Sequence, residues 1–94
     1  MRYKFRTGLS QAVTIWAASA ASATAFDTVT YAARVVATGN CHVEIGPAPV
    51  ATAASPVILA NALPEILSVS PGDKIAVIQD GSSTGTLYVT ELSQ

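Results

Sequence analysis

Short stretches in which apolar and polar residues alternate, each closed by a turn signal, follow one another along most of this chain. The clearest is CHVEIG at 41–46, where every second residue is apolar. No stretch shows the 3.6-residue period of an amphipathic helix. The segments with strand character are 11–16, 27–38, 41–46, 56–60, 65–69, 74–79 and 86–92. About seven short strands at this spacing predict an all-β fold, either a small antiparallel β-sandwich or a jelly-roll-like barrel.

Two of the turn signals predict hairpins. The dipeptide GN at 39–40 joins the second and third of these segments, and it suits the positive φ of a tight hairpin turn. SPGD at 70–73 joins the fifth and sixth, with Pro and Gly at the two central positions of a type II turn. We therefore expect each pair of segments to form antiparallel partners.

The Ala/Ser-rich stretch AASAASATAF at 17–26 allows two interpretations. A basic N-terminus before a partly apolar stretch, with ATA as a small-residue site, is typical of a signal peptide cut near Ala25. A signal peptide also needs a continuous apolar run of about 7–15 residues, and here polar residues interrupt it. The interruptions are Ser10, Gln11, Thr14 and Ser19. We favour a strand at 11–16 and expect an N-terminal arm at 1–10 and one β-sandwich domain at 11–94.

Charged residues make up only 12% of the sequence, about half the share in an ordinary soluble domain. Surface charge keeps a free monomer soluble, so the shortage favours a homo-oligomer whose faces are covered by neighbours. The alternative is an ordinary neutral domain. A net charge of −1 argues against specific nucleic-acid binding. No apolar run approaches the ~18 residues of a membrane span, so no membrane partner is expected.

Cys41 and His42 are the most reactive-looking pair, but adjacent strand residues point to opposite faces. The pair therefore cannot readily hold one metal ion or act as nucleophile and base, and the chain contains no further His or Cys. We expect a buried Cys41, and His42 on the outer face with Glu44. The carboxylates show no spacing typical of paired acids. The sequence thus predicts no enzyme, no catalytic or metal-binding residues and no cofactor.

The N-terminal MRYKFR alternates basic and aromatic residues, so that an extended segment would separate them onto two sides. Such a segment could add an edge strand to a neighbour or lie across it. The alternatives are contact with phosphate and a solvated arm. Trp16 could stack on a ligand, although packing in an interface or core is favoured. The candidate interface residues are Arg2, Tyr3, Lys4, Phe5 and Trp16.

From VTYAARVVATGN through CHVEIGPAPV, LPEIL and SPGDKIAVIQ to GTLYVTEL, covering residues 27–93, the sequence resembles a group of small virion proteins of tailed bacteriophages. The resemblance implies a β-sandwich structural protein located in the virion, on the capsid surface. Its partners would be the major capsid protein or other virion proteins, and it would decorate or cement the head by bridging capsid subunits. No functional residues carry over from it. The alternatives are a head–tail connector, tail or fibre-associated protein, and an exported surface- or carbohydrate-binding β-module.

Overall fold

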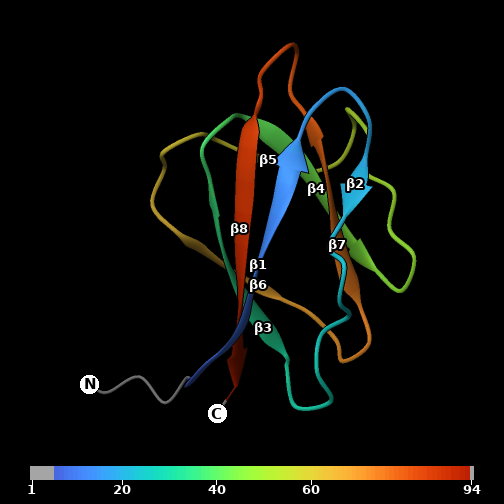
Figure 1. Cartoon of the computed structure of the whole chain (residues 1–94), viewed down its shortest axis with the longest axis vertical. Helices are drawn as coiled ribbons and strands as arrows, with labels where there is room; N and C mark the ends of the chain where they lie inside the picture. Colours follow the sequence, from blue (N-terminus) through green and yellow to red (C-terminus); the bar gives the residue numbers. More distant parts are fainter. Residues whose placement is uncertain (1–5, 94) are drawn as a thin grey trace.

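The computed structural model describes residues 6–93, which form eight β-strands and no helix. The strands make two antiparallel four-stranded sheets packed face to face, as predicted (Figure 1). Sheet A has the order β1-β8-β3-β6 and sheet B the order β2-β7-β4-β5. The strands are β1 (Arg6–Ile15), β2 (Ala20–Ala21), β3 (Ala32–Ala37), β4 (Cys41–Gly46), β5 (Val57–Ile58), β6 (Glu65–Ser68), β7 (Lys74–Gln79) and β8 (Gly85–Ser93).

The strand order is that of a jelly roll. β1 pairs with β8, β2 with β7, β3 with β6 and β4 with β5, so the chain folds back on itself as one long antiparallel ribbon. Two further pairings, β3 with β8 and β4 with β7, roll this ribbon into a double-sheet sandwich. Consecutive strands therefore belong to opposite sheets, with β4 and β5 as the exception among the described strands.

The core lies between the sheets and is built by the alternation seen in the sequence. Every second residue of β1, β3, β4, β7 and β8 points inward, and most of these side chains are Val, Ile, Leu or Ala. Each large aliphatic side chain removed from water stabilises the fold by roughly 1.5–3 kcal/mol. The fully buried side chains include Ile15, Val35, Cys41, Ile75, Val77, Leu87 and Val89.

Both predicted hairpins are wrong in their pairing, although the type II turn predicted at 70–73 does form. At 70–73 the amide N of Asp73 lies 3.0 Å from the carbonyl oxygen of Ser70, and Gly72 has φ 87°, as a type II turn requires. This turn nevertheless joins β6 of sheet A to β7 of sheet B. The GN turn likewise joins β3 to β4 across the sandwich. Because a turn sets only the local reversal of the chain, it does not decide which strands then pair.

The segment at 39–40 also differs from prediction in its backbone, because Gly39 does not adopt positive φ. Glycine is required at position 39 because the backbone of Thr84 approaches it closely. A Cβ at Gly39 would overlap the carbonyl oxygen of Thr84 and lie 2.8 Å from the carbonyl carbon. Across the same contact, Gly85 (φ 154°) would place a Cβ 2.6 Å from Thr38 Oγ1. The two glycines let the β3–β4 and β7–β8 connections touch at one end of the sandwich.

Strand boundaries differ from prediction in the first third of the chain. β1 begins at Arg6, five residues before the expected strand at 11, and pairs with β8 across a bulge between Thr7 and Ser10. The Ala/Ser stretch contributes the two-residue β2 to sheet B. The expected strand at 27–38 starts only at Ala32, because residues before it form a turn in which Thr30 N bonds the carbonyl oxygen of Asp27 at 3.0 Å.

Candidate functional site

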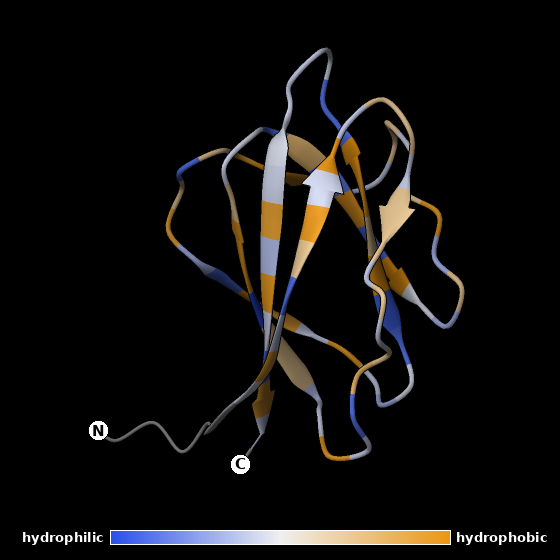
Figure 2. Cartoon of the chain, viewed as in Figure 1, coloured by the Kyte–Doolittle hydropathy of each residue, from blue (hydrophilic) through white to orange (hydrophobic). Residues whose placement is uncertain are grey.

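The outer face of sheet A is open to solvent and poor in charge. Along β1 and β8 the hydropathy alternates from residue to residue (Figure 2), because most of the large apolar side chains point into the core and mainly polar or small ones point outward. Tyr88 is 50% exposed, between Ala12 of β1 and Val36 of β3 in the register. Ile66 at the β6 edge is 56% exposed beside Arg34. Arg34 is the one charged side chain that strand alternation places on this face among the described residues.

The outer face of sheet B, in contrast, is covered by the chain itself. The loop 47–56 lies against this face, and two of its own residues, Ala51 and Ser55, are buried in the contact. Ser55 Oγ donates a hydrogen bond of 2.9 Å to Glu44 Oε1 on β4, and Thr52 N donates to Ser55 Oγ at 3.1 Å. Ala76 of β7 is fully buried as a result. The two outer faces of the sandwich therefore differ, and only that of sheet A is without such a cover in the described chain.

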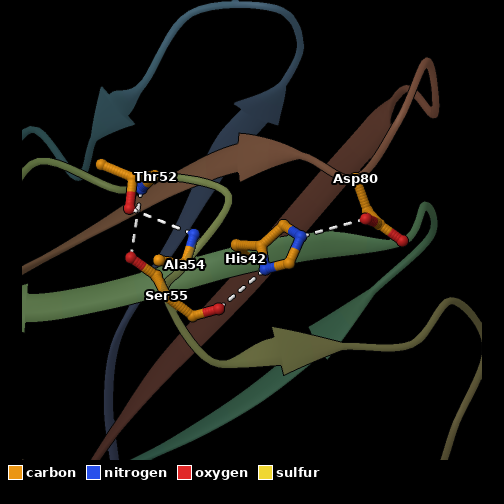
Figure 3. A network of polar contacts seen from close by, with 5 residues as sticks. All are labelled: His42, Thr52, Ala54, Ser55 and Asp80. Atoms are coloured by element: carbon orange, nitrogen blue, oxygen red, sulfur yellow. Dashed lines mark hydrogen bonds and ion pairs between the residues drawn. The ribbon is translucent and has the colours of Figure 1, made fainter.

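His42 helps to hold this loop in place (Figure 3). Its Nδ1 lies 2.7 Å from the carbonyl oxygen of Ser55, and its Nε2 lies 3.0 Å from Asp80 Oδ1. Both partners are acceptors, so both ring nitrogens can donate only when the imidazole is protonated. The hydrogen bonds to Ser55 and Asp80 raise the pKa of His42 above its ordinary value of 6.5. This arrangement is a structural clamp between β4, the loop and the end of β7.

Cys41 and His42 point to opposite faces, as predicted. Cys41 is fully buried between the sheets, and this desolvation, with a smaller contribution from the charge of Asp80, raises the pKa of its thiol to about 11. His42 lies on the outer face of sheet B, with its side chain 13% exposed under the loop. Within residues 6–93 no three His, Cys, Asp or Glu side chains come close enough together to hold a metal ion.

Glu91 is a buried carboxylate that the sequence analysis did not single out. Its Oε1 accepts hydrogen bonds from Thr30 Oγ1 at 2.6 Å and from the backbone N of Asp27 at 3.0 Å. The sequence did carry a signal for the burial of Glu91, because strand alternation puts it on the same face of β8 as Leu87 and Val89, which are both buried. The carboxylate ties the loop before β3 to the end of β8 and lines an open cavity of about 320 Å³.

Two further cavities lie beside the edge strand β6, and Leu67 and Ser68 line both of them. The first, of about 750 Å³, has no charged side chain in its lining, and we call it the uncharged cavity. The second, of about 310 Å³, is lined by residues of β4, β5 and β6 and by Pro56, with Glu44 and Glu65 among them. The uncharged cavity is lined by Thr28, Val29, Tyr31, Ala32, Ile66, Leu67, Ser68, Leu92 and Ser93.

Of the five predicted interface residues, Arg2, Tyr3, Lys4 and Phe5 lie outside the described residues. Trp16 directly follows β1 and is 52% exposed, and its carbonyl oxygen accepts a hydrogen bond of 3.0 Å from Gln79 N. It lines none of the three cavities. The sequence analysis did not predict these cavities. The uncharged cavity and the cavity at Glu91 are each lined by segments more than sixty residues apart, which only the tertiary fold brings together.

Comparison with protein-family models, with curated proteins and with solved structures gives no match for this chain. Residues 6–93 contain no helix that is long and apolar enough to cross a membrane. The fold and the site together define an all-β sandwich with one open, charge-poor sheet face.

Proposed function

We propose that this chain is a structural virion protein of a tailed bacteriophage that decorates and cements the capsid by bridging neighbouring capsid subunits. The observation that carries the proposal is the open outer face of sheet A, where Tyr88 is 50% and Ile66 56% exposed and, among the described side chains, Arg34 is the one charged group that strand alternation places there. Exposed apolar patches on a protein surface often mark protein–protein contacts.

Three further observations support this function. The charge-poor composition suits a protein whose surface is covered by neighbours. The sequence from 27 to 93 resembles small phage virion proteins in its packing and turn motifs. The jelly roll is also a fold used by viral capsid domains, which is support by analogy alone, because one fold serves many functions.

The face can supply enough contact area for such a role. The four strands are four to ten residues long, and at about 3.3 Å per residue and 4.8 Å between strands they present a flat area of about 450 Å². Side-chain relief and flanking residues enlarge it towards the ~800 Å² per partner of a stable interface. A repeated particle then multiplies each modest contact through avidity.

The test is co-sedimentation of the purified protein with capsids of a tailed phage that encodes it. The variant Tyr88→Glu places a charge in the centre of the outer face of sheet A and should abolish binding. The matched control Val50→Glu changes an even more exposed side chain, 66% accessible against 50% for Tyr88, on the loop that covers sheet B, and should bind normally. Equal binding by both variants would reject the outer face of sheet A as the capsid contact.

Copy number separates the decoration role from its closest alternative. A head decoration protein is present in a number close to that of the capsid subunits, whereas a connector, tail or fibre-associated protein occurs in a small symmetric number. Quantitative mass spectrometry of purified particles gives this ratio directly.

A carbohydrate-binding module is the second candidate, favoured by the uncharged cavity and by Tyr31, which is 67% exposed at its rim. Exposed aromatic rings provide stacking surfaces for sugar rings, and jelly rolls also form lectin domains. Glycan-array binding that is lost in Tyr31→Ala would favour this function over capsid binding.

A further inference from the structure

The longest free edge in the described part of the chain is that of β1. Among the four edge strands, β2 and β5 have two residues each and β6 has four, whereas β1 has ten. One side of β1 pairs with β8, and no other described strand pairs with its second side. Because short edges resist strand addition and long ones template it, β1 is the edge of this sandwich best suited to accept another strand.

The register with β8 identifies which backbone groups face the free side of β1. Thr86 directs both of its backbone groups toward β3, because its carbonyl oxygen accepts from Thr38 N at 3.0 Å and its own N donates to Thr38 Oγ1 at 2.8 Å. A residue of an antiparallel ladder directs its N–H and C=O to the same side, and the residue opposite directs both the other way. Thr14 lies opposite Thr86, so its N–H and C=O point to the free side. By alternation, those of Ala12 and Ser10 do the same.

This edge lacks the residues that usually block strand addition. From 7 to 26 the sequence contains no charged residue and no proline, both of which natural proteins place on edges to prevent pairing. A bulge also protects an edge, but the one between Thr7 and Ser10 affects only the beginning of β1. Residues 10–15 keep a regular register with β8 and form an unprotected edge.

The connection after β2 contacts β1 through a side chain on the inner side of sheet A. The amide of Gln11 pairs with the backbone of Thr24. Gln11 lies opposite the buried Val89, so its side chain belongs to the inner side. Ala12 and Thr14 remain exposed. The free side of β1 is therefore open at the residues whose backbone groups point out of the sheet.

We propose that β1 pairs antiparallel with β1 of a second copy, across a two-fold axis at Ala12, so that the two copies of sheet A become one eight-stranded sheet. In this register Ala12 lies opposite Ala12 of the second copy, and Ser10 lies opposite Thr14. Each of these three rungs exchanges two backbone hydrogen bonds, about six in all. The hydroxyls of Ser10 and Thr14 face each other, which is a favourable cross-strand pair.

A second copy fits this edge better than an unrelated chain. Self-pairing places small, uncharged side chains opposite one another, so no like charges meet. The added strand is already ordered within its own sheet, so the pairing costs little conformational entropy. The contact is isologous, which means that it uses the free side of both copies of β1 and closes at two copies.

The pairing also enlarges the surface on which the proposed function depends. One row across the joined sheet runs through Val36, Tyr88 and Ala12, and then through the same residues of the second copy in reverse order. It places the two exposed Tyr88 side chains about 15 Å apart. The two outer faces together present about 900 Å² of flat area, against the ~800 Å² per partner of a stable interface. This role rests on the proposed function, whereas the pairing itself does not.

Cysteine variants of β1 test both the dimer and its register. In Ala12→Cys the two thiols face each other at a Cα separation of about 5.5 Å, which a disulfide can bridge. Oxidation with copper phenanthroline should therefore link this variant into dimers. Thr14→Cys alone should give almost no product, because the two copies of this residue lie about 13 Å apart along the strands. Mixed with Ser10→Cys, it should give the heterodimer. Cys41 is fully buried, with a thiol pKa raised to about 11, and does not compete.

Equal yields from Ala12→Cys and Thr14→Cys would show random collision and would overturn the proposal. A heterodimer yield from Ser10→Cys and Thr14→Cys no higher than that of either variant alone would overturn it as well, because the two residues would not be opposite each other.

Sedimentation equilibrium of the full chain measures the contact without a cross-link. The wild type should approach twice the mass of one chain as its concentration rises. Ala12→Lys brings two ammonium groups together at the axis and should raise the Kd of the dimer by more than about tenfold. Mixing it with Ala12→Glu should restore the dimer. The matched control Val50→Lys adds the same charge at an exposed position of the loop over sheet B and should dimerise as the wild type does.

A wild type that stays monomeric at its highest soluble concentration would overturn the proposal, as would equal dimerisation of Ala12→Lys and Val50→Lys. The dimer and the proposed function can fail separately. Dimers in solution without capsid binding would reject the proposed function alone. Capsid binding through Tyr88 by a monomeric wild type would reject the dimer alone.

Discussion

The side-chain amide of Gln11 pairs with both backbone groups of Thr24, as a neighbouring strand would. Gln11 Nε2 donates to the carbonyl oxygen of Thr24 at 3.0 Å, and Thr24 N donates to Gln11 Oε1 at 3.0 Å. This pair attaches the long connection after β2 to β1 at the open side of the sandwich.

Gln11→Ala removes both hydrogen bonds and should lower the free energy of unfolding by about 1–2 kcal/mol, since each such bond contributes roughly 0.5–1.5 kcal/mol. Gln11→Glu should cost at least as much, because the carboxylate cannot donate to the Thr24 carbonyl oxygen. Urea unfolding followed by Trp16 fluorescence measures both. A Glu variant as stable as the wild type would contradict the donor role of Nε2.

The clamp at His42 makes stability depend on pH. Because the folded pKa of His42 lies above its ordinary value of 6.5, the folded state binds this proton more tightly than the unfolded state. The resulting stabilisation should be fully present below pH 6.5 and be lost as the pH rises through the folded pKa.

NMR titration of His42, the one histidine of the chain, gives this pKa directly. Asp80→Asn should lower the pKa toward, but not below, its ordinary value, because the Ser55 carbonyl oxygen still accepts from Nδ1. A wild-type pKa below 6.5, or stability that grows between pH 6 and 8 relative to His42→Gln, would contradict the clamp.

Gly39→Ala should destabilise the protein by about 3 kcal/mol, because the new Cβ would overlap the Thr84 backbone and push apart the two connections that meet there. The matched control is Gly46→Ala at the end of β4, where nothing lies within 4 Å of the new Cβ; its effect should stay within about 0.5 kcal/mol. Thermal and urea unfolding report both. Similar stability of the two variants would show that the approach at Gly39 is easily relaxed.

Glu91→Ala should cost about 3 kcal/mol, because it leaves the buried Thr30 hydroxyl and the Asp27 amide without their charged acceptor. Glu91→Gln retains an oxygen that can accept both bonds and should lose only about 1 kcal/mol. Unfolding curves at pH 7 distinguish the two. If the Ala and Gln variants were equally stable, the two hydrogen bonds would contribute little to the fold.

Much of the site chemistry could not be predicted from the sequence. The alternation in CHVEIG correctly placed Cys41 inside and His42 outside, because the side-chain period of a strand is a local property. The partners of His42, however, come from a loop and from the end of β7, and their approach depends on how the loop packs over sheet B. The same holds for the two surfaces beside β6, which bring together residues from three separate strands.

The sequence by itself determined that the chain is all-β, where most strands lie and which of their side chains face the core, because alternation and turn chemistry act over a few residues. Only the tertiary structure decided the pairing. SPGD makes its turn, yet β6 and β7 separate into different sheets, since β3 and β4 offer each of them a better-placed edge when the whole ribbon rolls up. Pairing depends on the burial of both sheets together, and no local stretch of sequence carries that information.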